Sequence, residues 1–310
     1  MKKFAFVFPG QGSQAVGMLD AFADNPAVRA TVAEAADALQ FDLGALIKSG
    51  PKEALDLTTN TQPIMLTAAV AFYRAWSAAG GPVPALLAGH SLGEYSALVA
   101  AGVLSFADAV PLVRFRAEAM QQAVPVGEGG MAAILGLSDA DVRAACVAAA
   151  QGDVVEAVNY NAPSQVVIAG HKDAVMRACE LAKAAGAKRA LLLAVSAPFH
   201  SSLLQPASQQ LRTYLATILF SVPQIPVINN VDVAIVSTPE AVRDALVRQA
   251  ARPVRWVETV QAMAAQGVTH VIECGPGRVL AGLTKRIDAS LVGEAIVEPA
   301  SIDKIMELLK

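Results

Sequence analysis

The chain has 310 residues, of which 54% are hydrophobic and 16% are charged. Together with a mean hydropathy of +0.45, this composition is typical of a globular protein with a large core and excludes an intrinsically disordered chain. The formal net charge of −3 lacks the positive excess of nucleic-acid-binding proteins, so we expect no nucleic-acid partner.

Membrane insertion, export and metal binding are not expected. The apolar stretch over residues 64–80 contains Arg74 and is shorter than the roughly 20 apolar residues that cross a bilayer. The apolar run over residues 4–8 is too short for a signal peptide, which predicts a cytoplasmic protein. The cysteines have no CxxC spacing, so neither a disulfide framework nor a metal site is predicted. They are Cys146, Cys179 and Cys274.

The first part of the chain predicts alternating strands and helices. Strands are predicted over residues 4–8 and 85–88, and helices over residues 26–40, 61–79, 95–101 and 105–123. The second strand is followed by a tight turn that carries Ser91.

From residue 125 the pattern predicts a small βαββαβ unit, the order of a ferredoxin-like module. Its predicted strands are 131–137, 154–159, 165–169 and 190–193, and its helices are 138–150 and 173–185. The larger pattern then resumes with a helix after residue 200, a strand over 227–229, a helix near 238–248, a strand over 270–274, and a last helix after 275–277. The sequence therefore predicts an α/β fold in which a large domain, residues 1–124 and 196–310, is interrupted by a small domain, residues 125–195.

Ser91 is the candidate nucleophile. Residues 89–93 read GHSLG and match G-x-S-x-G, with a predicted strand before the motif and a helix after it. Glycines on both sides allow a sharp turn, and the N-terminus of the following helix favours negative charge that develops nearby.

A serine nucleophile needs a base, and the chain has four histidines. His90 is adjacent to Ser91 and should point elsewhere, while His171 opens a helix and His270 opens an apolar strand. We interpret the last two as structural. His200 lies in a loop between a strand and a helix, where catalytic side chains are often displayed, and is the candidate base.

The acid that would orient this base is left open. In α/β-hydrolases it lies between the serine and the histidine in the chain. That interval offers aspartates, none of them in a loop obviously fitted to orient His200. They are Asp108, Asp139, Asp141, Asp153 and Asp173.

Four segments together carry a family resemblance. They are residues 8–14 (FPGQGSQ), 89–95 (GHSLGEY), 161–170 (NAPSQVVIAG) and 273–277 (ECGPG). The chain resembles the malonyl-CoA:acyl carrier protein transacylases of bacterial fatty-acid synthesis almost from end to end. The resemblance implies an α/β-hydrolase-like large domain and a ferredoxin-like small domain that covers the active-site cleft.

The resemblance also implies roles for individual residues. Ser91 is the acylated nucleophile and His200 the base, while Gln11 and the backbone N–H of Leu92 form the oxyanion site. The backbone carbonyl of Gln249 takes the place of the orienting acid.

Arg116 sits at the family position that pairs with the free carboxylate of malonyl. A guanidinium offers parallel donors to a carboxylate and stays charged when buried. Enclosing it without a carboxylate is costly, so the same residue disfavours neutral acyl groups. By resemblance, Gln62, His90 and Asn161 contact the substrate or coenzyme A, although Gln62 and Asn161 could equally be polar turn residues.

The expected activity is transfer of malonyl from malonyl-CoA to the pantetheine thiol of acyl carrier protein, through a malonyl-serine ester with ping-pong kinetics. We expect no metal or cofactor beyond the coenzyme A thioester that is the substrate, no membrane partner, and a monomer. The alternatives are a serine thioesterase or hydrolase, a free-standing acyltransferase of a polyketide or malonate-decarboxylase system, and a catalytically silent docking module.

Overall fold

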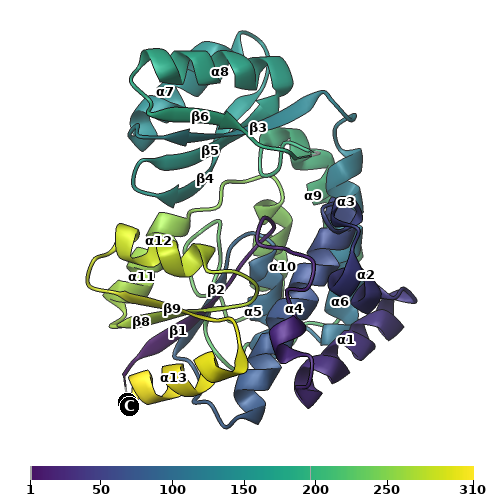
Figure 1. The fold of residues 1–310 in the computed structure, drawn as a ribbon. Coiled ribbons are helices and arrows are strands. Elements are labelled where there is room, and N and C mark those ends of the chain that lie inside the picture. The colour runs from purple at the N-terminus through teal and green to yellow at the C-terminus, as the bar shows by residue number, and fades with distance from the viewer. Residues whose placement is uncertain (1, 196) are drawn as a thin grey trace.

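The computed structural model describes residues 2–195 and 197–310. It contains a five-stranded sheet in a large α/β part and a four-stranded sheet in a smaller part above it (Figure 1). The predicted fold class, a large α/β unit with a smaller ferredoxin-like unit, is confirmed. Ser196, where the predicted large domain resumes, lies outside the described residues, and the proposed domain limits stay a prediction.

The large sheet is parallel throughout, in the order β7-β2-β1-β8-β9. Its strands are β1 (Phe4–Phe8), β2 (Leu86–Gly89), β7 (Val227–Ile228), β8 (His270–Cys274) and β9 (Val292–Ile296). Every residue of β1 is buried. Phe4, Phe6 and Phe8 pack into one core cluster, while Ala5 and Val7 pack into another on the opposite face. Burial on both faces explains why this strand is continuously apolar rather than alternating.

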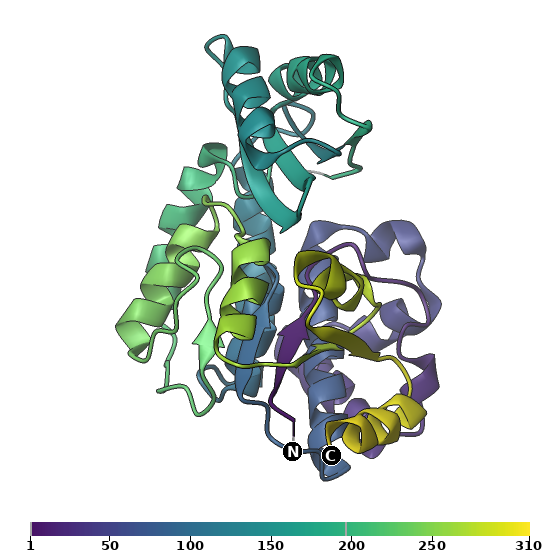
Figure 2. The same cartoon turned by 90° about the vertical axis from the view of Figure 1, so that its left-hand side faces the viewer.

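Helices cover both faces of this sheet (Figure 2). The face that receives the phenylalanines is packed by α1 (Pro26–Leu39), α2 (Leu43–Ser49), α3 (Lys52–Leu55), α4 (Thr58–Ala78), α5 (Gly93–Ala100), α6 (Phe106–Gln122), α9 (Gln205–Leu215), α10 (Pro239–Gln249) and α13 (Pro299–Leu309). The other face is packed by α11 (Trp256–Ala265) and α12 (Val279–Ile287). Short 3-10 helices cover Asp20–Phe22 and Ser202–Leu204. Among the described residues, no helix combines the length and apolar character needed to cross a membrane.

The small sheet is antiparallel, in the order β4-β5-β3-β6. Its strands are β3 (Gly129–Leu135), β4 (Val155–Ala162), β5 (Gln165–His171) and β6 (Arg189–Leu192), and α7 (Asp139–Ala150) and α8 (Lys172–Ala184) pack on one face. Met131, Val158 and Val167, from three of these strands, join the main core of the large part. The small sheet is thereby packed against the large part.

The C-terminal region corrects the sequence prediction. The helix that follows residues 275–277, α12, is not the last element, because β9 and α13 follow it. The helix α11 was also not expected. A signal for α13 was present, since Glu298 and Ser301 form a reciprocal capping box and Pro299 occupies the first turn.

Candidate active site

The candidate site lies at the carboxyl ends of the parallel strands, where open α/β sheets bind ligands. Gln11 follows β1, Ser91 follows β2, and Asn230 follows β7. His200 comes from the segment between β6 and α9. Strands that are distant in sequence therefore bring these residues to one edge of the sheet.

The turn at Ser91 is strained and tightly packed. Ser91 has φ 52°, in the left-handed region that non-glycine residues seldom occupy. A Cβ on Gly93 would lie 2.0 Å from the carbonyl oxygen of Phe8, so only glycine fits between this turn and β1. Asn230 secures the turn, because its Oδ1 accepts from the Ser91 N–H (2.7 Å) and its Nδ2 donates to the Gly89 carbonyl (2.7 Å). These contacts fix the backbone of the turn and so hold the Ser91 side chain in one orientation.

Ser91 and His200 are in hydrogen-bond contact, with 2.6 Å between Ser91 Oγ and His200 Nε2. His200 Nδ1 lies 2.8 Å from the carbonyl oxygen of Gln249. A carbonyl only accepts, so Nδ1 carries the proton and Nε2 offers its lone pair to the serine hydroxyl. Burial, and then the positive charge of Arg116, lower the pKa of His200 to about 3. The imidazole is therefore neutral and ready to accept a proton.

The contact with Gln249 explains why no acidic residue in the sequence fits the role of orienting His200. The Nδ1 partner is a backbone carbonyl, which no pattern of acidic residues could reveal. Asp108 instead accepts from the Ser105 hydroxyl at the start of α6, and Asp153 pairs with Arg177 on the small part.

Two backbone N–H groups, those of Leu92 and Gln11, are the candidates for the oxyanion site. Leu92 is buried immediately before α5, and Gln11 follows β1 in an exposed turn. Within residues 2–195 and 197–310, neither N–H has a recorded acceptor. The Gln11 side chain is engaged elsewhere, because its Nε2 donates to Thr58 Oγ1 (2.9 Å) and its Oε1 accepts from Gln62 Nε2 (3.3 Å). Any oxyanion contact of Gln11 is therefore assigned to its backbone.

Arg116 projects from α6 into the site and is 1% exposed. Its Nη1 donates to Gln62 Oε1 (2.8 Å), and its Nη2 donates to Gln249 Oε1 (3.0 Å) and Ser91 Oγ (3.2 Å). Its guanidinium also lies over the ring of Tyr95, 5.3 Å from the centroid. These partners are neutral, so the described structure shows a buried positive charge beside the serine without a directly bonded carboxylate.

Two functional candidates were missed by sequence reasoning, Asn230 and Glu94. Glu94 is buried in the first turn of α5, and its Oε2 accepts from the Asn230 N–H (2.9 Å) and from Gln249 Nε2 (2.9 Å). Burial raises the pKa of Glu94 to about 7, although both hydrogen bonds and the charge of Arg116 lower it. The signal for Asn230 was a polar residue at the carboxyl end of a buried strand, whereas Glu94 gave none, because it resembles an ordinary acidic residue in the first turn of a helix.

His90 and Asn161 contact one another across the two parts of the molecule. His90 Nε2 lies 2.8 Å from Asn161 Oδ1, and the His90 ring packs 5.5 Å from that of Trp256. The predicted strand ending at residue 159 continues to Ala162 as β4, so Asn161 belongs to a strand rather than to a turn. Contacts of His90, Asn161 and Gln62 with substrate or coenzyme A stay predictions.

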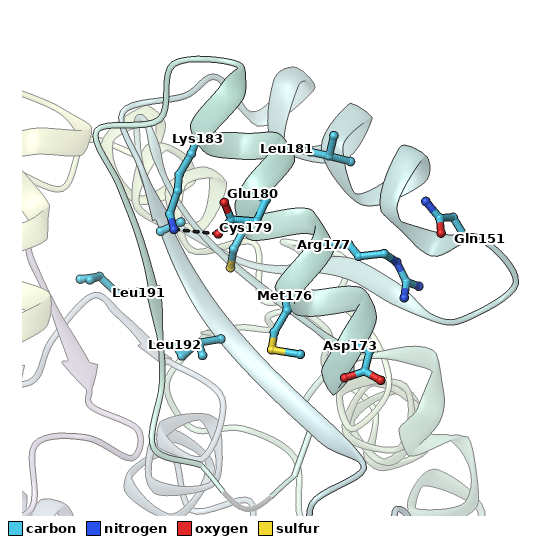
Figure 3. Close-up of a pocket in the computed structure, with 11 residues that line it drawn as sticks. Gln151, Asp173, Met176, Arg177, Cys179, Glu180, Leu181, Lys183, Leu191 and Leu192 are labelled. Atoms are coloured by element: carbon cyan, nitrogen blue, oxygen red, sulfur yellow. Dashed lines mark hydrogen bonds and ion pairs between the residues drawn. The ribbon is translucent and has the colours of Figure 1, made fainter.

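A separate groove of about 900 Å³ lies on the small part between α8 and β6 (Figure 3). Figure 3 shows the side chains of Met176 on α8 and Leu192 on β6 lining the groove, and the ion pair between Lys183 and Glu180, both on α8. The groove contains none of the predicted site residues. In the described part of the chain, no group of three or more His, Cys, Asp or Glu side chains could hold a metal ion.

Comparison with known proteins places these features in context. The profile of the acyl transferase domain family matches residues 5–296. The malonyl CoA-acyl carrier protein transacylase of Escherichia coli strain K12 is 58% identical over 309 residues, which cover 99% of this chain and 100% of the relative. The crystal structure of an acyl-carrier-protein S-malonyltransferase from Burkholderia pseudomallei 1710b is 68% identical, with a TM-score of 0.97 and coverage of 98% of this chain and 99% of that one. A malonyl-transacylase solved in complex with its type II polyketide synthase acyl carrier protein is 53% identical, with a TM-score of 0.98 and coverage of 99% and 100%.

Proposed function

The chain belongs to the malonyl-CoA:acyl carrier protein transacylases of the acyl transferase domain family, and we propose that it carries malonyl to the carrier's pantetheine thiol as an ester on Ser91. The proposal rests on one arrangement above all. A buried guanidinium, Arg116 Nη2, lies 3.2 Å from the hydroxyl that would be acylated. A malonyl group on Ser91 would bring its free carboxylate to this charge, whereas an acetyl group would not.

In the first half-reaction, Ser91 Oγ attacks the thioester carbonyl carbon while its proton passes to His200 Nε2. The carbonyl oxygen becomes negative and is held by the N–H groups of Leu92 and Gln11. Donors placed in this way are worth about 2.7–4 kcal/mol each in related acyl-transfer sites. Collapse of this intermediate breaks the C–S bond, and the coenzyme A sulfur leaves with the proton from His200.

In the second half-reaction, the carrier's pantetheine thiol gives its proton to His200 and its sulfur attacks the ester carbonyl. The C–O bond to Ser91 then breaks, and His200 returns the proton to the serine oxygen. Each half-reaction begins and ends with a neutral imidazole, which the carbonyl of Gln249 holds by its Nδ1–H. Ping-pong kinetics follow, because coenzyme A leaves before the carrier reacts.

The buried arginine argues against a general esterase, which gains nothing from a charge that only a carboxylated acyl group can satisfy and that costs free energy to bury. Whether the malonyl ester passes to the carrier or to water is decided by experiment. The test supplies labelled malonyl-CoA and holo-carrier protein together and measures labelled carrier against free malonate. The proposal predicts mostly labelled carrier with wild type and no label transfer with Ser91→Ala. Release mainly as malonate would instead identify a thioesterase.

Fatty-acid synthesis is the expected destination of the malonyl group, as in the named relatives. A second destination has specific support, since one relative was solved with a polyketide carrier. The rates of malonyl transfer to a fatty-acid carrier protein and to a polyketide carrier protein, compared side by side, decide between the two destinations.

The remaining parts of the proposal concern cofactors, assembly and location. The steps above require neither a metal nor a redox cofactor. We propose a monomer because one chain supplies every candidate site residue. Nucleic acid is not proposed as a partner, given the net charge of −3. A cytoplasmic location is proposed, since coenzyme A thioester and carrier protein must share a compartment with the enzyme.

A further inference from the structure

Glu94 is connected to Arg116 through a single side chain. The amide of Gln249 lies between them, accepting from Arg116 Nη2 at Oε1 (3.0 Å) and donating from Nε2 to Glu94 Oε2 (2.9 Å). A guanidinium only donates and an ionised carboxylate only accepts, so the charges at the two ends fix the orientation of the amide. Glu94 and Arg116 thus belong to one buried hydrogen-bond network that runs through the side chain of Gln249.

The charges of this network change when substrate binds. Before binding, an ionised Glu94 balances Arg116, whose direct hydrogen-bond partners in the described structure are neutral. A malonyl carboxylate on Arg116 adds a second negative charge to a buried site that has one positive charge. Removing a carboxylate charge by protonation restores neutrality, and buried sites favour the neutral form.

We propose that Glu94 determines malonyl specificity in a pH-dependent manner, taking one proton from solvent when the malonyl carboxylate binds Arg116. The inference rests on the proposed function. It makes malonyl binding, but not acetyl binding, compete with ionisation of Glu94. The preference for malonyl over acetyl therefore falls as pH rises.

The other titratable groups near Glu94 keep the same protonation state between pH 6 and pH 8. Tyr95 on α5 has its pKa raised to about 12 by burial, and His200 has a pKa of about 3. Asp232, after β7, has its pKa lowered by its hydrogen bonds to Arg248 and stays ionised. Arg116 on α6 stays charged as guanidinium groups do.

Glu94 itself titrates within this range. Burial raises its pKa to about 7, against the opposing effect of its hydrogen bonds and of Arg116. A carboxylate bound to Arg116 offsets that positive charge and raises the pKa further. Linkage then requires proton uptake on malonyl binding near neutral pH.

Glu94→Gln removes the charge while conserving the contacts. Both recorded hydrogen bonds of the carboxylate end on Oε2, so the single carbonyl oxygen of a glutamine at this position can accept both. Glu273→Gln is the matched control. Glu273 is also buried with a pKa raised to about 7, but it accepts from the N–H of Ala281 in α12, outside the network of Arg116.

The experiment measures acyl-enzyme formation, as coenzyme A release, with malonyl-CoA and acetyl-CoA from pH 6 to pH 8. Titration of the coenzyme A phosphates affects both substrates and cancels in the malonyl-to-acetyl ratio of kcat/KM. Wild type and Glu273→Gln should lose about threefold or more of this ratio across the range, because even a coupling of about fivefold, the lower end of typical values, is only partly expressed within two pH units. In Glu94→Gln the ratio should stay constant. A constant ratio in wild type, or an unchanged fall in Glu94→Gln, overturns the inference.

A second measurement uses wild type alone and is independent of whether the variant folds. In weak buffer at pH 7, an indicator dye should report more proton uptake on loading with malonyl than with acetyl. Equal uptake for the two acyl groups overturns the inference while leaving malonyl transfer intact. Failure of wild type to load malonyl at all overturns the proposed function and, with it, this inference.

Discussion

Replacing Arg116 by alanine tests how the site distinguishes malonyl from acetyl. The substitution removes the buried positive charge and leaves Gln62 Oε1 and Gln249 Oε1 without their recorded donor. A malonyl carboxylate would then enter a buried site with no positive partner. Removing one member of a buried ion pair costs about 3–5 kcal/mol. At 1.4 kcal/mol for each factor of ten, we expect kcat/KM for malonyl-CoA to fall roughly 10²- to 4 × 10³-fold.

Acetyl transfer should respond in the opposite direction. The charge of Arg116 is the second cause of the low pKa of His200, after burial. Its removal raises that pKa toward the usual value and makes the imidazole a stronger base. An acetyl group has no carboxylate that loses a partner, and its transfer is catalysed by a stronger base. We therefore expect kcat/KM for acetyl-CoA to equal or exceed the wild-type value.

The assay measures kcat/KM for both thioesters in the variant and in Arg114→Ala. Arg114 is the matched control, because it lies on the same helix in a partly exposed pair with Glu118 at 3.5 Å. Exposed pairs contribute at most about 1 kcal/mol, so its loss should leave the malonyl-to-acetyl ratio unchanged. Thermal unfolding verifies that both variants are folded. A folded Arg116→Ala enzyme with wild-type selectivity would refute the role of the guanidinium.

Two further predictions concern stability. His200 has a pKa of about 3, below its usual 6.5, so the unfolded chain binds the extra proton between these values. The contribution of His200 to the free energy of unfolding is therefore complete above pH 6.5 and is lost as pH falls toward 3. Measured by urea unfolding, the free energy of unfolding of wild type should fall by up to about 1.4 kcal/mol per pH unit more than that of His200→Asn. Parallel pH dependences of the two proteins would contradict this. Gly93→Ala forces a Cβ against the Phe8 carbonyl and should cost about 1–3 kcal/mol and slow acylation. Gly282→Ala has open space within α12 and should instead stabilise by up to about 1 kcal/mol; thermal unfolding of both variants checks the contrast.

Local patterns explain what the sequence could predict. The run FAFVF at residues 4–8 is apolar throughout, which is typical of a strand buried on both faces, and β1 has these bounds. The order βαββαβ predicts a ferredoxin-like unit, and the observed element order confirms that pattern. Ser91 was found because its motif describes a local turn between a strand and a helix, which depends on few distant residues.

Contacts between distant segments explain what the sequence could not predict. The partner of His200 Nδ1 is the carbonyl of Gln249, 49 residues away. The family resemblance implied this contact, but no side-chain pattern identifies it, because every residue has a carbonyl. Glu94 contacts Gln249 over 155 residues and looks like an ordinary acidic residue in the first turn of a helix. Asn230 holds the Ser91 turn from a different strand. Each of these contacts depends on which strands become neighbours in the sheet.

The most direct test of the account is the mass of the enzyme after brief mixing with malonyl-CoA in the absence of carrier. The account predicts one added malonyl group, mapped to the peptide that carries Ser91, lost when holo-carrier protein is added and absent in Ser91→Ala. An unmodified protein, or a malonyl group on another residue or still present in Ser91→Ala, would contradict it.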